Sequence, residues 1–120
     1  MPFMFEHLRV YPEAVNFADS VADLVETFGG RHRVLADQLT RASISIPLNI
    51  AEGNGRSHTA DRRQFFVVAR GSVHECVALL ELCKRRGLMD DAVPGARTQE
   101  LEGLAKMLSG LMAGLERRHR

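Results

Sequence analysis

The chain has 120 residues, of which 45% are hydrophobic and 26% are charged, and its formal net charge is +1 at pH 7. A chain of this length and hydrophobic content is predicted to form a single globular domain over residues 1–120 with a modest core. The N-terminus lacks a basic start followed by an apolar run, and no stretch of about 18 uncharged apolar residues occurs. A membrane protein is therefore not expected, and the sequence predicts a soluble cytoplasmic protein.

The charges are distributed unevenly along the chain. Residues 1–30 have five acidic side chains and one basic side chain, a net charge of −4, whereas residues 31–86 have ten basic and five acidic side chains, a net charge of +5. This asymmetry is compatible with pairing inside the protomer, with complementary faces between subunits, or with a basic surface that binds a polyanion. The charges alone leave these three arrangements open.

Apolar residues recur at spacings of three and four in four segments, which predicts four helices. Their expected ranges are 10–28, 32–54, 59–86 and 96–117, with turns at Gly29-Gly30 and Pro94-Gly95. No alternating pattern typical of strands competes with them. Because short connections favour antiparallel neighbours, the predicted fold is all-α, an up-down-up-down four-helix bundle.

The last predicted helix has the most regular apolar stripe. Its spacing alternates between three and four residues, as is typical of the seam of a helix bundle. The stripe consists of Leu101, Leu104, Leu108, Leu111 and Leu115.

The second predicted helix has a second apolar stripe, in which Ile44 and Leu48 lie roughly opposite the stripe that contains Ile46. A bundle helix needs only one buried stripe, so a helix that is apolar on two sides is expected to be covered on both. The third helix contains the apolar run 65–69, which includes Phe66. We therefore expect Ile44, Leu48 and Phe66 at the interface of a cyclic homo-oligomer. The alternative is a central helix in a monomer.

Pro47 lies inside the second predicted helix, where it removes an amide donor and is expected to bend the helix. Polar residues follow it on this helix and recur on the third, and buried polar groups need partners. We expect a structural polar network between the two helices rather than a catalytic or ligand-binding site. Its predicted members are Asn49, Glu52, Arg70, Ser72 and Glu75.

An enzymatic function is not favoured by the residues. The Glu-x-x-His spacing of dimetal carboxylate bundles occurs only at 116–119, near the C-terminus. The five histidines lack zinc-binding spacing, and the sequence GNG at 53–55 has no preceding strand, as a phosphate loop would require. Cys76 and Cys83 belong to no nucleophile motif and, two helical turns apart, are too distant for a disulfide. The sequence predicts a non-enzyme without a cofactor or a metal.

Basic clusters mark both ends of the third predicted helix. Taken singly, each is also compatible with a solvated helix end, because basic side chains suit helix C-termini. Aromatic residues make up only 6% of the chain and tryptophan is absent, which favours backbone contacts over base stacking in any nucleic-acid complex. The candidate nucleic-acid-binding residues are Arg56, Arg62, Arg63, Lys84, Arg85 and Arg86.

Two segments resemble a known family. The sequences SIPLNIAEGNGR at 45–56 and QFFVVARGSVHE at 64–75, together with FEHLRVY at 5–11, resemble the family called four-helix bundle protein or 23S rRNA intervening-sequence protein. The resemblance covers nearly the whole chain. The positions that match the family pattern are Ile46, Pro47, Asn49, Ile50, Ala51, Glu52, Gly53, Gly55, Arg56, Phe65, Ala69, Arg70, Gly71, Ser72 and Glu75.

The resemblance implies a four-helix up-and-down protomer that assembles into a homo-oligomeric ring, with five as the implied number of subunits. Some genes of this family lie within insertions in large-subunit ribosomal RNA genes, and a related branch serves as the nucleic-acid-binding accessory subunit of diversity-generating retroelement reverse transcriptases. We therefore expect a non-enzymatic ring that binds the backbone of RNA or DNA. The alternative is a scaffold that binds a protein partner and no nucleic acid.

Overall fold

A computed structural model gives the structure of the chain and describes residues 8–90 and 95–118. Four long helices account for most of these residues, which include no strand, so the prediction of an all-α protein is confirmed. They are α1 (Val10–Glu26), α2 (Arg33–Asn54), α3 (Thr59–Arg85) and α4 (Ala96–Arg118). A short 3-10 helix, η2 (Gly30–His32), precedes α2 and was not predicted from the sequence.

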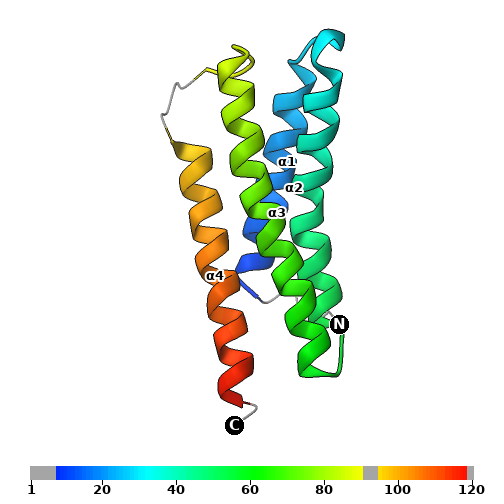
Figure 1. Cartoon of the computed structure of the whole chain (residues 1–120), viewed down its shortest axis with the longest axis vertical. Coiled ribbons are helices and arrows are strands. Elements are labelled where there is room, and N and C mark those ends of the chain that lie inside the picture. The colour runs from blue at the N-terminus through cyan, green and yellow to red at the C-terminus, as the bar shows by residue number, and fades with distance from the viewer. Residues whose placement is uncertain (1–7, 91–94, 119–120) are drawn as a thin grey trace.

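Each helix packs against the one that follows it in the chain, and α1 also contacts α4. Figure 1 shows that the chain reverses its direction at each connection, so that successive helices lie side by side along the long axis. The principal-axis extents are 49, 26 and 22 Å. None of the described helices is long and apolar enough to cross a membrane.

The predicted helix ends agree with the structure to within two residues. The largest difference is at the end of α1, which stops at Glu26 instead of residue 28. There the hydroxyl of Thr27 donates to the carbonyl oxygen of Leu24 at 2.7 Å and competes with a further helical turn. The end of α3 follows the prediction, because Gly87 adopts a positive φ of 69° and the amide of Leu88 donates to the carbonyl of Cys83.

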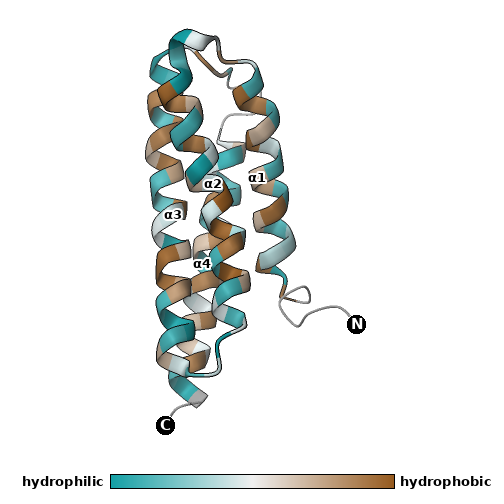
Figure 2. Ribbon diagram, turned by 90° about the vertical axis from the view of Figure 1, so that its right-hand side faces the viewer, coloured by the Kyte–Doolittle hydropathy of each residue, from teal (hydrophilic) through white to brown (hydrophobic). Residues whose placement is uncertain are grey.

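Each helix presents an apolar stripe to a common interior, and Figure 2 shows apolar and polar residues alternating along every ribbon. The largest fully buried side chains are Phe17, Phe66, Leu39, Ile46, Ile50, Leu101, Leu104 and Leu108. One predicted core residue differs on α4, where Met112 is buried and Leu111 is only half-buried. Both lie within one step of the 3.6-residue period, so spacing alone does not decide between them.

Candidate nucleic-acid interface

Polar side chains join α2 to α3 near the middle of the two helices. The hydroxyl oxygens of Ser45 and Ser72 lie 2.8 Å apart, and Ser72 is buried. The side-chain amide of Asn49 donates to the carbonyl oxygen of Ser45 at 2.8 Å and to its hydroxyl at 3.0 Å. These contacts satisfy polar groups between two packed helices, so the cluster has the structural role expected for a network.

Two predicted members of this network lie elsewhere. Arg70 faces α4, where its guanidinium donates to the hydroxyl of Ser109 at 3.2 Å. Residues 70 and 72 are two positions apart on α3 and therefore point in nearly opposite directions, so they cannot both face α2. Glu52 accepts from Arg56 on its own helix at 3.3 Å. The prediction was therefore wrong for Arg70 and Glu52.

Glu75 contacts α2 through an unpredicted partner. Its carboxylate forms an ion pair with Arg41, which lies one helical turn before Ser45. Together with the contact between Ser45 and Ser72, this ion pair fixes the register of the two helices, because the residue numbers of facing partners add to 116 or 117. Continuing that register brings the start of α2 level with the end of α3.

The start of α2 and the end of α3 lie at the same end of the molecule (Figure 1), and five basic residues belong to or adjoin these segments. We call this group the basic end. Three members were candidates from the sequence. Arg31 in η2 and Arg33 at the first position of α2 were missed, because they come near the end of α3 only through the pairing of α2 with α3. The basic end consists of Arg31, Arg33, Lys84, Arg85 and Arg86.

Most of the basic end faces solvent. Arg31, Arg33 and Arg86 are exposed and form no ion pair with a described residue, whereas Arg85 pairs with Glu81 on its own helix at 3.2 Å. The acidic residue Glu26 lies at the end of α1, at the same end of the molecule as the basic end. An exposed ion pair is worth little in water, so Arg85 remains able to exchange its carboxylate partner for a phosphate.

The other three candidate arginines lie at the opposite end of α3, roughly 35 Å away by the helical rise. All three already contact the protein. Arg56 lies over the ring of Phe65, 4.8 Å from its centroid, and Arg63 pairs with Glu116 at 3.5 Å. Arg62 donates to the side-chain oxygen of Asn54 at 3.1 Å. The six candidates therefore form two separate groups and not one continuous surface.

The two predicted interface residues of α2 are exposed, and the third is not. Leu48 is 59% exposed and Ile44 is 44% exposed, although both are large and apolar. Phe66 is 1% exposed and packs inside its own protomer, so a neighbouring subunit cannot cover it. The run 65–69 surrounds the helix, and its members Phe66 and Ala69 point to the core. The prediction was wrong for Phe66.

Other exposed apolar residues share the surface of Leu48. On α2, Val34 and Leu48 lie seven residues either side of Arg41, and on α3, Val68 and Leu82 lie seven residues either side of Glu75. Seven residues are two turns, so each set occupies one stripe, and the ion pair between Arg41 and Glu75 brings the stripes together. We call this surface, with Ile44, the apolar face.

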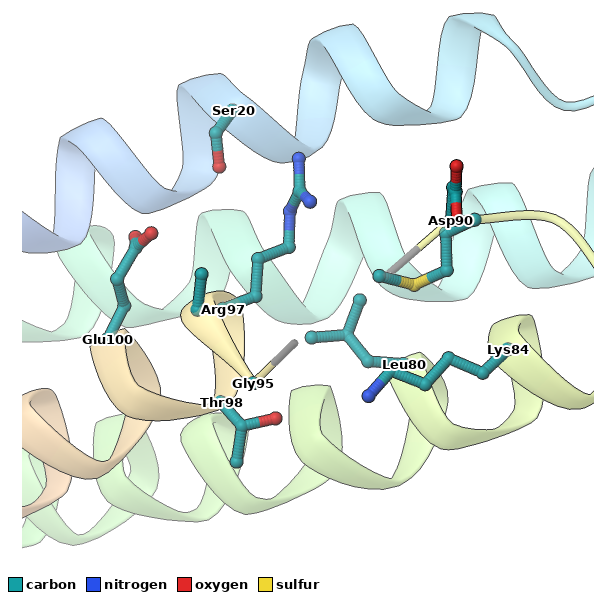
Figure 3. A pocket seen from close by; sticks show the side chains of 10 residues that line it. Ser20, Leu80, Lys84, Asp90, Gly95, Arg97, Thr98 and Glu100 are labelled. Atoms are coloured by element: carbon teal, nitrogen blue, oxygen red, sulfur yellow. The ribbon is translucent and has the colours of Figure 1, made fainter. Parts of the chain in front are cut away.

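A pocket of about 280 Å³ lies at the N-terminal end of α4 (Figure 3). Arg97 extends from α4 toward α1, where Ser20 lies, and Lys84 lines the pocket from α3. Asp90 and Glu100 line it as well, so its charges are of both signs. This composition selects neither an anion nor a cation.

Neither cysteine is suited to act as a nucleophile. Burial raises the pKa of the Cys76 thiol to about 12, an effect to which Glu75 adds and which Arg41 opposes. Burial also raises the pKa of Cys83. The thiolate is the reactive form, so both groups are inert at neutral pH. Within residues 8–90 and 95–118, no group of three or more His, Cys, Asp or Glu side chains could hold a metal ion.

A solved structure has a similar fold. It is the crystal structure of a protein of unknown function from the S23 ribosomal protein family of Bacteroides thetaiotaomicron, with a TM-score of 0.80 and 21% sequence identity. The match covers 87% of this chain and 95% of the other. At this identity the likeness shows the fold alone. A comparison with curated protein sequences finds no match.

The match to a protein-family model identifies the family, which the structural likeness does not. Residues 6–110 match the family described as 23S rRNA-intervening sequence protein. The matched range includes α1, α2 and α3 in full, the polar contacts between α2 and α3, and most of α4. The chain belongs to the 23S rRNA-intervening sequence protein family.

Proposed function

We propose that this chain is a non-enzymatic accessory protein that binds the backbone of RNA or DNA through its basic end. The protomer in this proposal is an up-down-up-down four-helix bundle, and several copies form a cyclic ring. The family name supports a link to ribosomal RNA, and the inert thiols support a role without covalent catalysis.

The main observation is that five basic residues lie at the basic end, in η2, at the start of α2 and around the end of α3. Three of them, Arg31, Arg33 and Arg86, are exposed and without a described acidic partner. Arginine binds phosphate oxygens in a bidentate geometry, and such contacts hold a nucleic acid without reading its sequence. With one tyrosine and no tryptophan in the chain, base stacking on aromatic side chains contributes little.

Assembly strengthens this proposal. The apolar face exposes large apolar side chains from two helices on either side of the ion pair between Arg41 and Glu75, and exposed apolar surface of this kind marks interaction sites. We propose that a second copy of the chain covers it and that the ring has five subunits, the number implied by the family resemblance. Repeating a modest basic end in each subunit converts weak single contacts into multivalent binding.

The test compares charge reversals at the two ends of α3. Fluorescence anisotropy is measured with single-stranded and double-stranded RNA and DNA at low salt. The variant Arg31→Glu/Arg33→Glu/Arg86→Glu should lose most of its affinity for every probe, because each exposed contact becomes repulsive. Arg62→Glu/Arg63→Glu is the comparison at the other end and should lose less.

Binding that is absent in the unmodified protein, or that survives the three reversals unchanged, would reject the proposal. It would leave the alternative function, a scaffold for a protein partner. The apolar face is the observation that favours this alternative, because it exposes large apolar side chains whether or not nucleic acid binds.

A further inference from the structure

A second pocket, of about 270 Å³, lies beyond the N-terminal end of α1. Because α1 begins only at Val10, the connection between α2 and α3 and the last turns of α4 extend past its start (Figure 1). Beyond the start of α1, the side of α4 that would otherwise face α1 lines the pocket. Its apolar lining comes from Leu8, Phe66, Leu111 and Leu115.

Two guanidinium groups reach this pocket from different helices. Arg62 comes from α3 and is fixed by its hydrogen bond to Asn54, which also lines the pocket. Its Nε is inaccessible to solvent and has no hydrogen-bond partner, although burying an unpaired donor of a charged group is costly. Arg117 folds back along α4, with its Nη2 3.8 Å from the position that a β-carbon on Gly114 would occupy.

The charge of the pocket selects its ligand. Among the described residues, two arginines line it and no carboxylate does, because the neighbouring Glu116 pairs with Arg63 instead. Two guanidinium groups carry two positive charges, so they match a ligand with two negative charges better than a carboxylate ligand with one. A phosphate monoester has a charge of about −1.5 to −2 at neutral pH and offers three acceptor oxygens.

The shape and polarity add a second requirement. Part of the pocket lining is apolar, and Gly110 and Gly114 contribute a strip of α4 backbone without side chains of its own. A planar or apolar group can lie against such a strip while its phosphate contacts the arginines. Free phosphate would leave the apolar part of the lining unused.

We propose that the pocket binds a phosphate monoester attached to a planar or apolar group, with a nucleoside monophosphate as its simplest form. Arg62 and Arg117 hold the phosphate, and the side-chain amide of Asn54 is free to donate to the attached group. This site is separate from the basic end, which lies roughly 35 Å away along α3. The inference therefore does not depend on the proposed nucleic-acid binding.

The test is a calorimetric titration of the full chain with adenosine 5′-monophosphate, adenosine and inorganic phosphate as separate probes. The monophosphate should bind about tenfold or more tightly than either fragment, because only it contacts both the arginines and the apolar part of the lining. Equal affinity for the monophosphate and adenosine would overturn the proposal.

Two variants locate the binding. Gly114→Leu fills the pocket without removing either arginine. The matched control Gly103→Leu adds the same side chain to the same helix, at a position where a β-carbon meets no atom within 4 Å. We expect Gly114→Leu to weaken monophosphate binding about tenfold and Gly103→Leu to leave it unchanged. Arg117→Gln should also weaken it about tenfold, by loss of a charged hydrogen bond, and its exposed position protects the fold. Unchanged affinity in both Gly114→Leu and Arg117→Gln would contradict this site.

Discussion

Gly53 and Phe66 lie so close together that a β-carbon at residue 53 would come within 2.9 Å of Cε1 of the phenylalanine ring. The same atom would lie 2.9 Å from Cβ of Phe65. Real β-carbons do not approach other atoms this closely, so the last turn of α2 can contact α3 only because residue 53 has no side chain. This contact explains why an apolar helix contains a glycine at a buried position.

Gly53→Ala is therefore expected to destabilise the protein. Overpacking costs about 1–3 kcal/mol and outweighs the gain in helix propensity, which is about 1 kcal/mol. Gly71→Ala is the control, because a β-carbon there meets no atom within 4 Å and should stabilise α3. Urea denaturation measures both free energies of unfolding. If Gly53→Ala were as stable as Gly71→Ala, the close contact would not exist in solution.

The helices were predictable because each has an apolar stripe of period 3.6 and a glycine or proline near its ends. The 3-10 helix η2 was not predictable, because the three residues Gly30–His32 are too few to show a repeating pattern. Phe66 was placed wrongly for a related reason. A run of five apolar residues surrounds a helix, and only the packing of α3 against the other helices selects the members that enter the core, Phe66 and Ala69.

The candidate site was predictable in part. The cluster at 84–86 is contiguous in sequence, so composition reveals it, whereas Arg31 and Arg33 join it only through the pairing of α2 with α3. The polar network was recognisable from its residue types. Its membership was not, because Arg70 and Ser72 are close in sequence but face different helices.

The hydroxyls of Ser45 and Ser72 are expected to be coupled, so that their contributions to the free energy of unfolding are not additive. Ser45→Ala removes a partner from Ser72 and from Asn49 and is expected to cost about 1–2 kcal/mol. Ser72→Ala should cost a similar amount, and the double variant less than the sum, since no hydroxyl is then left unpaired. Strictly additive free energies of unfolding would show that the two hydroxyls do not interact.

Leu48→Asp is expected to separate the proposed oligomer while leaving the protomer folded. Leu48 is exposed in the protomer, so the substitution should change its stability by less than about 0.5 kcal/mol. Within a dry subunit contact, however, an unpaired charge is costly. Light scattering measures the mass of the assembly, and circular dichroism checks the helices. The control Val77→Asp, on the side of α3 away from the apolar face, should leave the mass of the assembly unchanged. If the unmodified chain were monomeric, the proposed assembly would be refuted.

The raised pKa of Cys76 makes the stability depend on alkaline pH. Its folded-state pKa of about 12 exceeds the ordinary value of 9.0, so the thiol contributes its full stabilisation below pH 9. That contribution is lost as the pH rises from 9 toward 12, because the unfolded chain releases the proton first. Denaturation midpoints of the unmodified protein should fall over this range more steeply than those of Cys76→Ala. Parallel pH profiles would show that Cys76 is not buried in the folded chain.

Salt dependence separates phosphate binding at the basic end from other modes of association. Each arginine that neutralises a phosphate releases counterions, so the logarithm of the binding constant should fall linearly with that of the salt concentration, by about 0.7–0.9 per contact. Arg33→Gln and Arg86→Gln should each reduce this slope by about one contact on RNA and on DNA of any sequence. Val34→Thr, next to Arg33 but uncharged, should leave the slope unchanged. A slope that stays the same when both arginines are removed would place the phosphate contacts elsewhere on the molecule.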